Sequence, residues 1–276
     1  QTPGFSGADI ANMCNEAALI AARYDKKQVE KQDFLDAVDR IIGGLEKKNK
    51  IITPEEKRAV AVHEAGHATI SWMCEHAHPL VKVTIVPRGR SLGAAWYLPD
   101  ERQITRTEQM LDEMCATLGG RAAEKVVFDK ISTGALSDLE KVTKQAMAMV
   151  SIYGLNDKIG NVSYYNMDQG FSKPFSEKQA ALMDDEIKKL TDEQYARAIK
   201  ILSENKDKLL ALADQLLEKE VIFKEDLEKI FGMSASDAVA KTKAPVIQDA
   251  EAIEEVVAEV TAEAKTKENS VEEAGE

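Results

Sequence analysis

The chain has 276 residues, of which 44% are hydrophobic and 5% aromatic, and its 36 basic and 48 acidic side chains give a formal charge of −12. This acidic balance argues against a nucleic-acid-binding protein, because phosphate contacts need a concentrated basic face. Frequent Ala, Leu, Glu and Lys favour helices. Cys14, Cys74 and Cys115 form no CxxC motif, which indicates neither a disulfide framework nor a cysteine-type zinc site and fits a reducing compartment.

We expect two helices in the first segment, residues 1–45. Ser6 and Asp9 have the spacing of a capping box, and a run rich in Ala, Leu and Ile over residues 10–24 follows them. A second short helix is expected over residues 31–42, where a pair of glycines ends it. Helices of this size bury little core alone, and the chain opens with neither Met nor a signal peptide. We therefore expect this segment to be the end of a domain in a longer protein.

A larger helical domain is expected over residues 53–232, after a charged linker over residues 46–52. Thr53 and Glu56 form a second capping box around a Pro at the first helical position, so a helix is expected from there to about residue 74.

The rest of the chain is predicted to contain one hairpin, several helices and a tail. Alternating residues over 81–86, a Pro-Arg-Gly turn and a returning stretch over 91–98 predict one small β-hairpin or sheet in a mainly α fold. Further helices are expected at 105–120 with a continuation to 128, at 137–154 behind a capping box from Ser137 to Glu140, at 176–203, and as two shorter helices up to 231. Residues 251–276 hold nine Glu and two Lys, so we expect residues 233–276 to be an acidic, disordered tail.

The strongest chemical signal is the run His63-Glu64-Ala65-Gly66-His67. On a helix, His63 and His67 lie one turn apart on the same face, so both imidazoles can reach one metal ion. Glu64 lies about 100° around the helix, which disfavours it as a ligand of that ion but lets it reach a water on the metal. Zinc lowers the pKa of such a water to about 7, and Glu64 would then act as a general base.

The alternative interpretation is an ordinary helix, because the bare pattern arises by chance in on the order of 1 in 100 chains of this length. Residues 59–74 are apolar on nearly every side, which predicts a buried helix. Burial of two His and one Glu is costly unless they are paired or bind a metal. Gly66 inside a helix costs about 1 kcal/mol relative to Ala, which indicates close packing there. We therefore favour the metal site.

Spacing alone leaves the third ligand unassigned, although a catalytic zinc site takes three protein ligands and keeps one open position. The acidic candidates are Glu113, Glu124, Asp129 and Asp138. Asp138 has a competing explanation, because a carboxylate in the first turn of a helix favours the helix dipole. The other candidates lie too near the motif in sequence to fold back easily, and they are Cys74, His76 and His78.

Four blocks closely resemble successive motifs of the FtsH family, which comprises membrane-anchored, ATP-dependent zinc metalloproteases. In order along the chain they are VHEAGHA at 62–68, KVTIVPRG at 82–89, GGRAAE at 119–124 and STGALSDL at 132–139. The run TPGFSGAD at 2–9 likewise resembles the small helical lid of the family's AAA+ ATPase module.

The resemblance implies a helical zinc metallopeptidase domain preceded by a lid remnant. It implies His63, His67 and Asp138 as ligands of one Zn²⁺ per chain and Glu64 as the catalytic carboxylate. Glu124 matches a further acid near the family's site, which we carry only as a partner of a ligand. The implied function is a zinc-dependent endopeptidase for unfolded or membrane proteins that an ATP-driven ring delivers.

The chain contains no counterpart of the P-loop lysine, the Walker-B acids or the family's N-terminal membrane segments. ATP would therefore bind only in the missing ATPase core, and we expect no ATP hydrolysis by this chain. The family further implies a homohexamer at the bacterial inner membrane, with the peptidase domain on the cytoplasmic side. The hairpin would offer an edge to which an extended substrate peptide could add as a strand.

Two other functions are weighed against the peptidase. In a non-catalytic scaffold, zinc would only hold helices together, and a filled four-ligand shell would favour that interpretation. In a deformylase-like metallohydrolase, a thiol would be the third ligand, but neither Cys74 nor Cys115 lies in a matching Gly-rich context.

Overall fold

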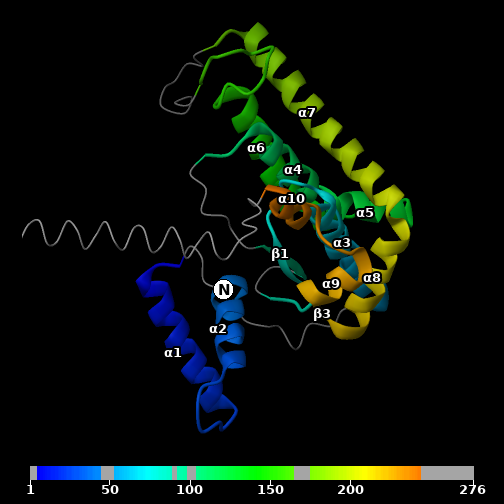
Figure 1. Ribbon diagram of the computed structural model, residues 1–276. Coiled ribbons are helices and arrows are strands. Elements are labelled where there is room, and N and C mark those ends of the chain that lie inside the picture. Colours follow the sequence, from blue (N-terminus) through cyan, green and yellow to red (C-terminus); the bar gives the residue numbers. More distant parts are fainter. Residues whose placement is uncertain (1–4, 45–52, 89–91, 98–103, 165–174, 244–276) are drawn as a thin grey trace, which may run out of the picture. The chain divides into compact units, whose positions relative to one another are not determined.

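A computed structural model describes residues 5–44, 53–88, 92–97, 104–164 and 175–243 (Figure 1). The chain divides into two compact units, Gln1–Ala238 and Val239–Glu276. The second unit is described only as far as Lys243, in the last turns of helix α10. The linker expected at 46–52 and residues 244–276 of the expected tail lie outside the described residues.

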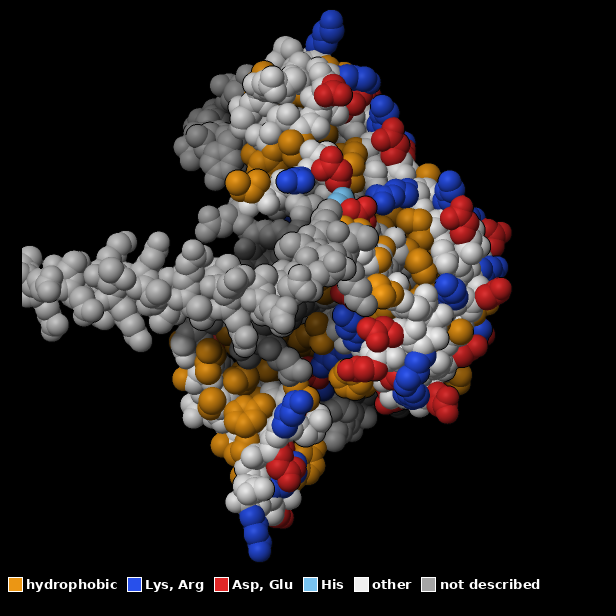
Figure 2. All heavy atoms as spheres, viewed as in Figure 1, with side chains coloured by type: hydrophobic (Ala, Val, Ile, Leu, Met, Phe, Trp, Pro, Cys, Tyr) orange, Lys and Arg blue, Asp and Glu red, His pale blue; other side chains and the backbone are white. Residues whose placement is uncertain are grey.

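The first segment forms two helices, α1 (Gly7–Arg23) and α2 (Lys31–Gly43). The predicted capping box is confirmed, because the Ser6 side chain accepts from the Asp9 backbone N–H while the Asp9 side chain accepts from the Ser6 backbone. The two helices share a small core of Ala17, Ile20 and Ala37. Apolar side chains nevertheless remain exposed on both (Figure 2), and they include Ile10, Leu19 and Ile42.

Helix α3 (Pro54–Met73) lies at the centre of the larger core. It packs against α5 (Gly119–Phe128) and α8 (Lys206–Lys219). The close packing predicted at Gly66 is confirmed, because a Cβ there would lie 2.4 Å from the Gly119 carbonyl oxygen and 2.5 Å from the Ala123 Cβ. The helix is buried on most sides, as its apolar sequence predicts.

A three-stranded antiparallel sheet lies beside α3, in the order β2-β1-β3. Strands β1 (Leu80–Thr84) and β2 (Ala94–Tyr97) form the predicted hairpin. Strand β3 (Val221–Phe223) pairs with the other edge of β1 and was not predicted, because three residues are too short for an alternating pattern. Among the described strands, β1 is therefore central, and β2 and β3 lie at the two edges.

The middle helices differ from the prediction in where they begin and end. The helix expected at 105–120 ends at Thr117 as α4 (Thr107–Thr117), and its expected continuation is a separate helix, α5, which begins after Leu118. The capping box predicted at Ser137 is wrong: Ser132 instead caps a short 3₁₀ turn, η1 (Thr133–Ala135), and α6 (Leu136–Ser151) follows directly. Asp138 consequently lies in the first turn of α6.

The remaining helices are α7 (Glu177–Glu204), capped by Ser176 as predicted, α8, α9 (Lys224–Phe231) and α10 (Ala235–Lys243). The long helix α7 packs against α4, α5 and α6. Helix α10 occupies the first part of the segment expected to be a disordered tail. Among the described residues, none of the helices combines the length and the apolar composition needed to cross a bilayer.

Candidate metal centre

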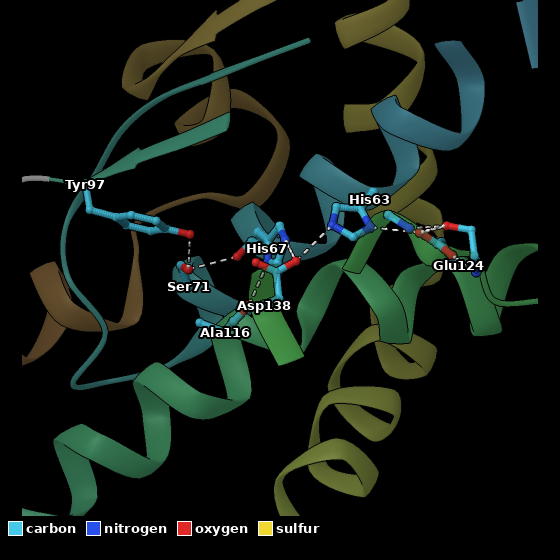
Figure 3. A network of polar contacts seen from close by, with 9 residues as sticks. His63, His67, Ser71, Tyr97, Ala116, Glu124 and Asp138 are labelled. Atoms are coloured by element: carbon cyan, nitrogen blue, oxygen red, sulfur yellow. Dashed lines mark hydrogen bonds and ion pairs between the residues drawn. The ribbon is translucent and has the colours of Figure 1, made fainter. Parts of the chain in front are cut away.

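Helix α3 presents both histidines from one face (Figure 3). Their ring centroids lie 4.8 Å apart in an edge-to-face arrangement. The side chains of His63 and His67 are only 12% and 11% exposed, and Glu64 is 8% exposed. Spacing on one helix therefore places two imidazoles and a carboxylate together inside the fold, as the sequence predicts.

Asp138 reaches the same point from the first turn of α6. Its Oδ2 lies 3.2 Å from His63 Nε2 and 3.4 Å from His67 Nε2. Four tetrahedral ligands that are each about 2.0–2.1 Å from zinc lie about 3.3 Å from one another, so these separations match a zinc site. One atom from each of the three residues lies within 4.8 Å of the others, and this is the one group of three such ligands among the residues that the structure describes.

Hydrogen bonds on the far side of each ring orient the nitrogen that faces Asp138. His63 Nδ1 lies 2.8 Å from Glu124 Oε1, and His67 Nδ1 lies 2.8 Å from the Ala116 carbonyl oxygen. A carbonyl oxygen and a carboxylate can only accept, so each Nδ1 donates and each Nε2 keeps its lone pair for a metal. Glu124 is held in turn by Ser132, whose backbone N–H and hydroxyl donate to it at 2.7 and 3.0 Å.

The charges at this point favour a cation. Burial opposes protonation of His63, but hydrogen bonds with Asp138 and Glu124 outweigh it and raise the pKa of His63 to about 10. Burial likewise acts to raise the pKa of Asp138, and hydrogen bonds with the two histidines hold that pKa well below its usual range. A divalent cation between the three groups would supply the positive charge that a proton otherwise supplies.

Burial raises the pKa of Glu64 above its usual value of 4.5. This carboxylate also lies directly under the chain that leads into β2, because a Cβ at Gly93 would be 2.7 Å from Glu64 Cγ. A second glycine approaches the site from α5, where a Cβ at Gly120 would be 2.3 Å from His63 Nε2. Our sequence reasoning missed both contacts, although the Gly119-Gly120 pair inside a helical pattern was a readable signal.

The other candidate ligands lie elsewhere. Glu113 is exposed and accepts from Gln145, while Asp129 is exposed beside Lys125. Cys74 and Cys115 are buried against each other, and no thiol belongs to the group of ligand atoms found among the described residues. Because that group holds three ligands and none is sulfur, the deformylase-like and four-ligand scaffold interpretations lack their defining feature there.

A His-Glu-x-x-His pattern on a helix, with a third carboxylate brought to its two imidazoles, is typical of a zinc metallopeptidase domain. Comparison with known families supports the same class: residues 50–230 match the model of peptidase family M41, and residues 1–36 match the AAA+ lid domain. The chain belongs to peptidase family M41.

Named relatives are close in sequence. The "ATP-dependent zinc metalloprotease FtsH" of Parabacteroides distasonis is 66% identical over 85% of this chain and 35% of its own length. The FtsH of Karelsulcia muelleri is 56% identical over 83% of this chain and 38% of its own length. The mouse "Mitochondrial inner membrane m-AAA protease component AFG3L2" is 50% identical over 84% of this chain and 29% of its own length. The chain thus spans about a third of the length of the curated relatives it matches.

Proposed function

We propose that this chain carries the peptidase module of an ATP-dependent zinc metalloprotease. The observation that carries the proposal is the convergence of His63, His67 and Asp138 at separations of 3.2 and 3.4 Å, with Glu64 beside them on α3. His63, His67 and Asp138 hold the metal, and Glu124 and the Ala116 carbonyl orient the two imidazoles.

When bound, zinc supplies a Lewis acid for the peptide carbonyl and lowers the pKa of water to near neutrality. Glu64 accepts the proton of the attacking water and returns it to the leaving amine nitrogen, so the carboxylate is unchanged after each turnover. Its burial under Gly93 keeps bulk water away from the exchange.

Replacement of the proposed base tests this role. We expect Glu64→Gln to retain zinc, because no ligand is changed, and to lose cleavage of unfolded casein by at least about 100-fold. Glu193→Gln, an exposed substitution of the same kind on α7, is the matched control. Cleavage of casein by Glu64→Gln at the control's rate would remove Glu64 from the mechanism.

The substrate peptide is proposed to add as a strand to β2. Among the described strands β2 pairs only with β1, and Gly93 at its start touches the proposed base. A peptide on that edge would gain main-chain hydrogen bonds and pass beside the metal site. Proline at Ala95, which pairs with Val83, should weaken peptide binding, whereas Ala95→Gly keeps the amide and should not. Unchanged binding by Ala95→Pro would contradict strand addition.

The intact protein is proposed to act as a homohexamer on unfolded or membrane proteins, which an ATP-driven ring delivers. ATP binds in the ATPase core of that protein, and the first two helices are the end of its lid, consistent with the match at residues 1–36 and the exposed apolar side chains of α1 and α2. We place it at the bacterial inner membrane, with the peptidase domain on the cytoplasmic side. The proposed division is 1–45 lid, 46–52 linker, 53–232 peptidase domain and 233–276 acidic tail.

A further inference from the structure

Strand β2 contacts the metal-site helix at two points. At its start, Gly93 lies so close to Glu64 that a Cβ there would be 2.7 Å from the Glu64 Cγ. At its end, the Tyr97 hydroxyl oxygen lies 3.1 Å from Ser71 Oγ (Figure 3). Ser71 in turn donates to the His67 carbonyl oxygen at 2.8 Å, so this second contact reaches the backbone of a proposed metal ligand.

The spacing of the two contacts is nearly the same on the strand and on the helix. Gly93 and Tyr97 are four residues apart on extended chain, which spans about 13 Å. Glu64 and Ser71 are seven residues apart on α3, which spans about 10.5 Å. The strand therefore runs alongside the helix in the same direction. On the helix, His67 lies between the two contacts and His63 lies directly before the first.

The Ser71 hydroxyl joins the end of β2 to the backbone of α3. Ser71 Oγ shares its one hydrogen between the His67 carbonyl oxygen at 2.8 Å and the Tyr97 hydroxyl oxygen at 3.1 Å. Burial of the hydroxyl raises the pKa of Tyr97, against a smaller opposing effect of the Ser71 hydrogen bond, and the carboxylates of Glu64 and Asp138 add to the rise. The Tyr97 hydroxyl therefore stays protonated throughout the neutral range, although 36% of the residue is exposed.

We propose that Tyr97 is a positioning residue that holds the far end of β2 against α3 and so sets where a bound peptide lies relative to Glu64. This inference rests on the proposed addition of substrate to β2. Gly93 fixes one end of the strand by shape, and the Tyr97–Ser71–His67 chain of hydrogen bonds fixes the other. A peptide that pairs along the whole strand depends on both contacts, whereas a probe confined to the metal depends on neither.

Two fluorescent hydroxamate probes distinguish peptide binding along β2 from binding at the metal alone, because both bind through the metal but only the longer one covers β2. One carries a single residue and the other five, and their dissociation constants are measured on the zinc-loaded chain. We expect Tyr97→Phe to weaken the five-residue probe about three- to tenfold, as for one lost hydrogen bond, and to leave the one-residue probe unchanged. Ser71→Ala should act alike, and the double variant should add little to either.

The matched controls remove the same groups elsewhere. Tyr153→Phe changes an exposed tyrosine, and Ser203→Ala changes a serine that donates to the Ile199 carbonyl within α7. Equal weakening of both probes by Tyr97→Phe, or of neither, would overturn the positioning role. If the unsubstituted chain binds both probes equally well, strand addition fails and this inference fails with it. If it binds neither, the proposed peptidase function itself is refuted.

Discussion

Gly120→Ala should separate metal binding from folding. A Cβ at Gly120 would lie 2.3 to 2.5 Å from three atoms of the His63 imidazole. Carbon atoms in contact normally stay about 3.5–4.0 Å apart, so the ring must move by about 1 Å. Metal–ligand distances tolerate only about 0.2 Å, so such a shift removes His63 from the donor set.

The expected loss of zinc affinity can be estimated from the role of His63. Disturbing a residue that only supports a metal ligand costs about 10- to 100-fold in metal affinity, and Gly120→Ala moves a ligand itself. We therefore expect the zinc dissociation constant to rise by at least about 100-fold, or about 2.7 kcal/mol. The metal-free fold should change less, because alanine improves helix propensity by up to about 1 kcal/mol and the His63 ring can turn aside.

Competition with a chromophoric chelator measures the zinc dissociation constant, and thermal melting of the EDTA-treated chain measures the fold. Gly7→Ala is the control, because it makes the same change in helix α1 where nothing lies within 4 Å. Zinc affinity of Gly120→Ala equal to that of the Gly7→Ala chain would refute the argument, since the ring would then have room that the structure denies it.

Three further outcomes are expected. Gly66→Ala should lower the free energy of unfolding by about 2 kcal/mol in chemical denaturation, because the new Cβ meets the Gly119 backbone at 2.4 Å and neither helix can yield cheaply. EDTA should abolish casein cleavage and lower the melting temperature, and zinc should restore both; lowered melting with unchanged cleavage would favour a scaffold. Hydrogen bonds from Lys158 and Asn156 lower the pKa of Glu186 below 4.5, so the stabilisation by its charged form is present above that pH and is lost as the pH falls through the lowered value. The melting temperature should therefore fall as the pH drops below about 4.5, and it should fall less in Glu186→Gln.

Local signals made most helices predictable. The capping boxes at Ser6 and Thr53 involve residues three apart, so nothing distant could alter them. The same reasoning failed at Ser137, because Ser132 upstream caps a 3₁₀ turn that starts the helix earlier. Strand β3 has no local signal of its own, since its three residues are extended through pairing with β1, far away in sequence.

One part of the candidate site could likewise be predicted from local sequence, and another part could not. Helical periodicity alone brings His63 and His67 together, but the choice between Glu124 and Asp138 depends on which nitrogen of His63 each one meets. Glu124 lies at Nδ1 and Asp138 at Nε2, and the orientation of a ring cannot be read from spacing. The family resemblance pointed to Asp138 as a ligand, and the structure brings Asp138 to both histidines.

The close packing of α3 on α5 also sets the orientation of the His63 imidazole. Gly66 and Gly119 let the two helices approach until backbone meets backbone. Glu124 lies about one and a half turns beyond Gly119 on α5, so that approach also sets its 2.8 Å contact with His63 Nδ1. Helices pushed about 1 Å apart would stretch this contact beyond hydrogen-bond range and free the ring to turn. The small residues of this interface therefore hold the imidazole with Nε2 facing Asp138, as well as filling the core.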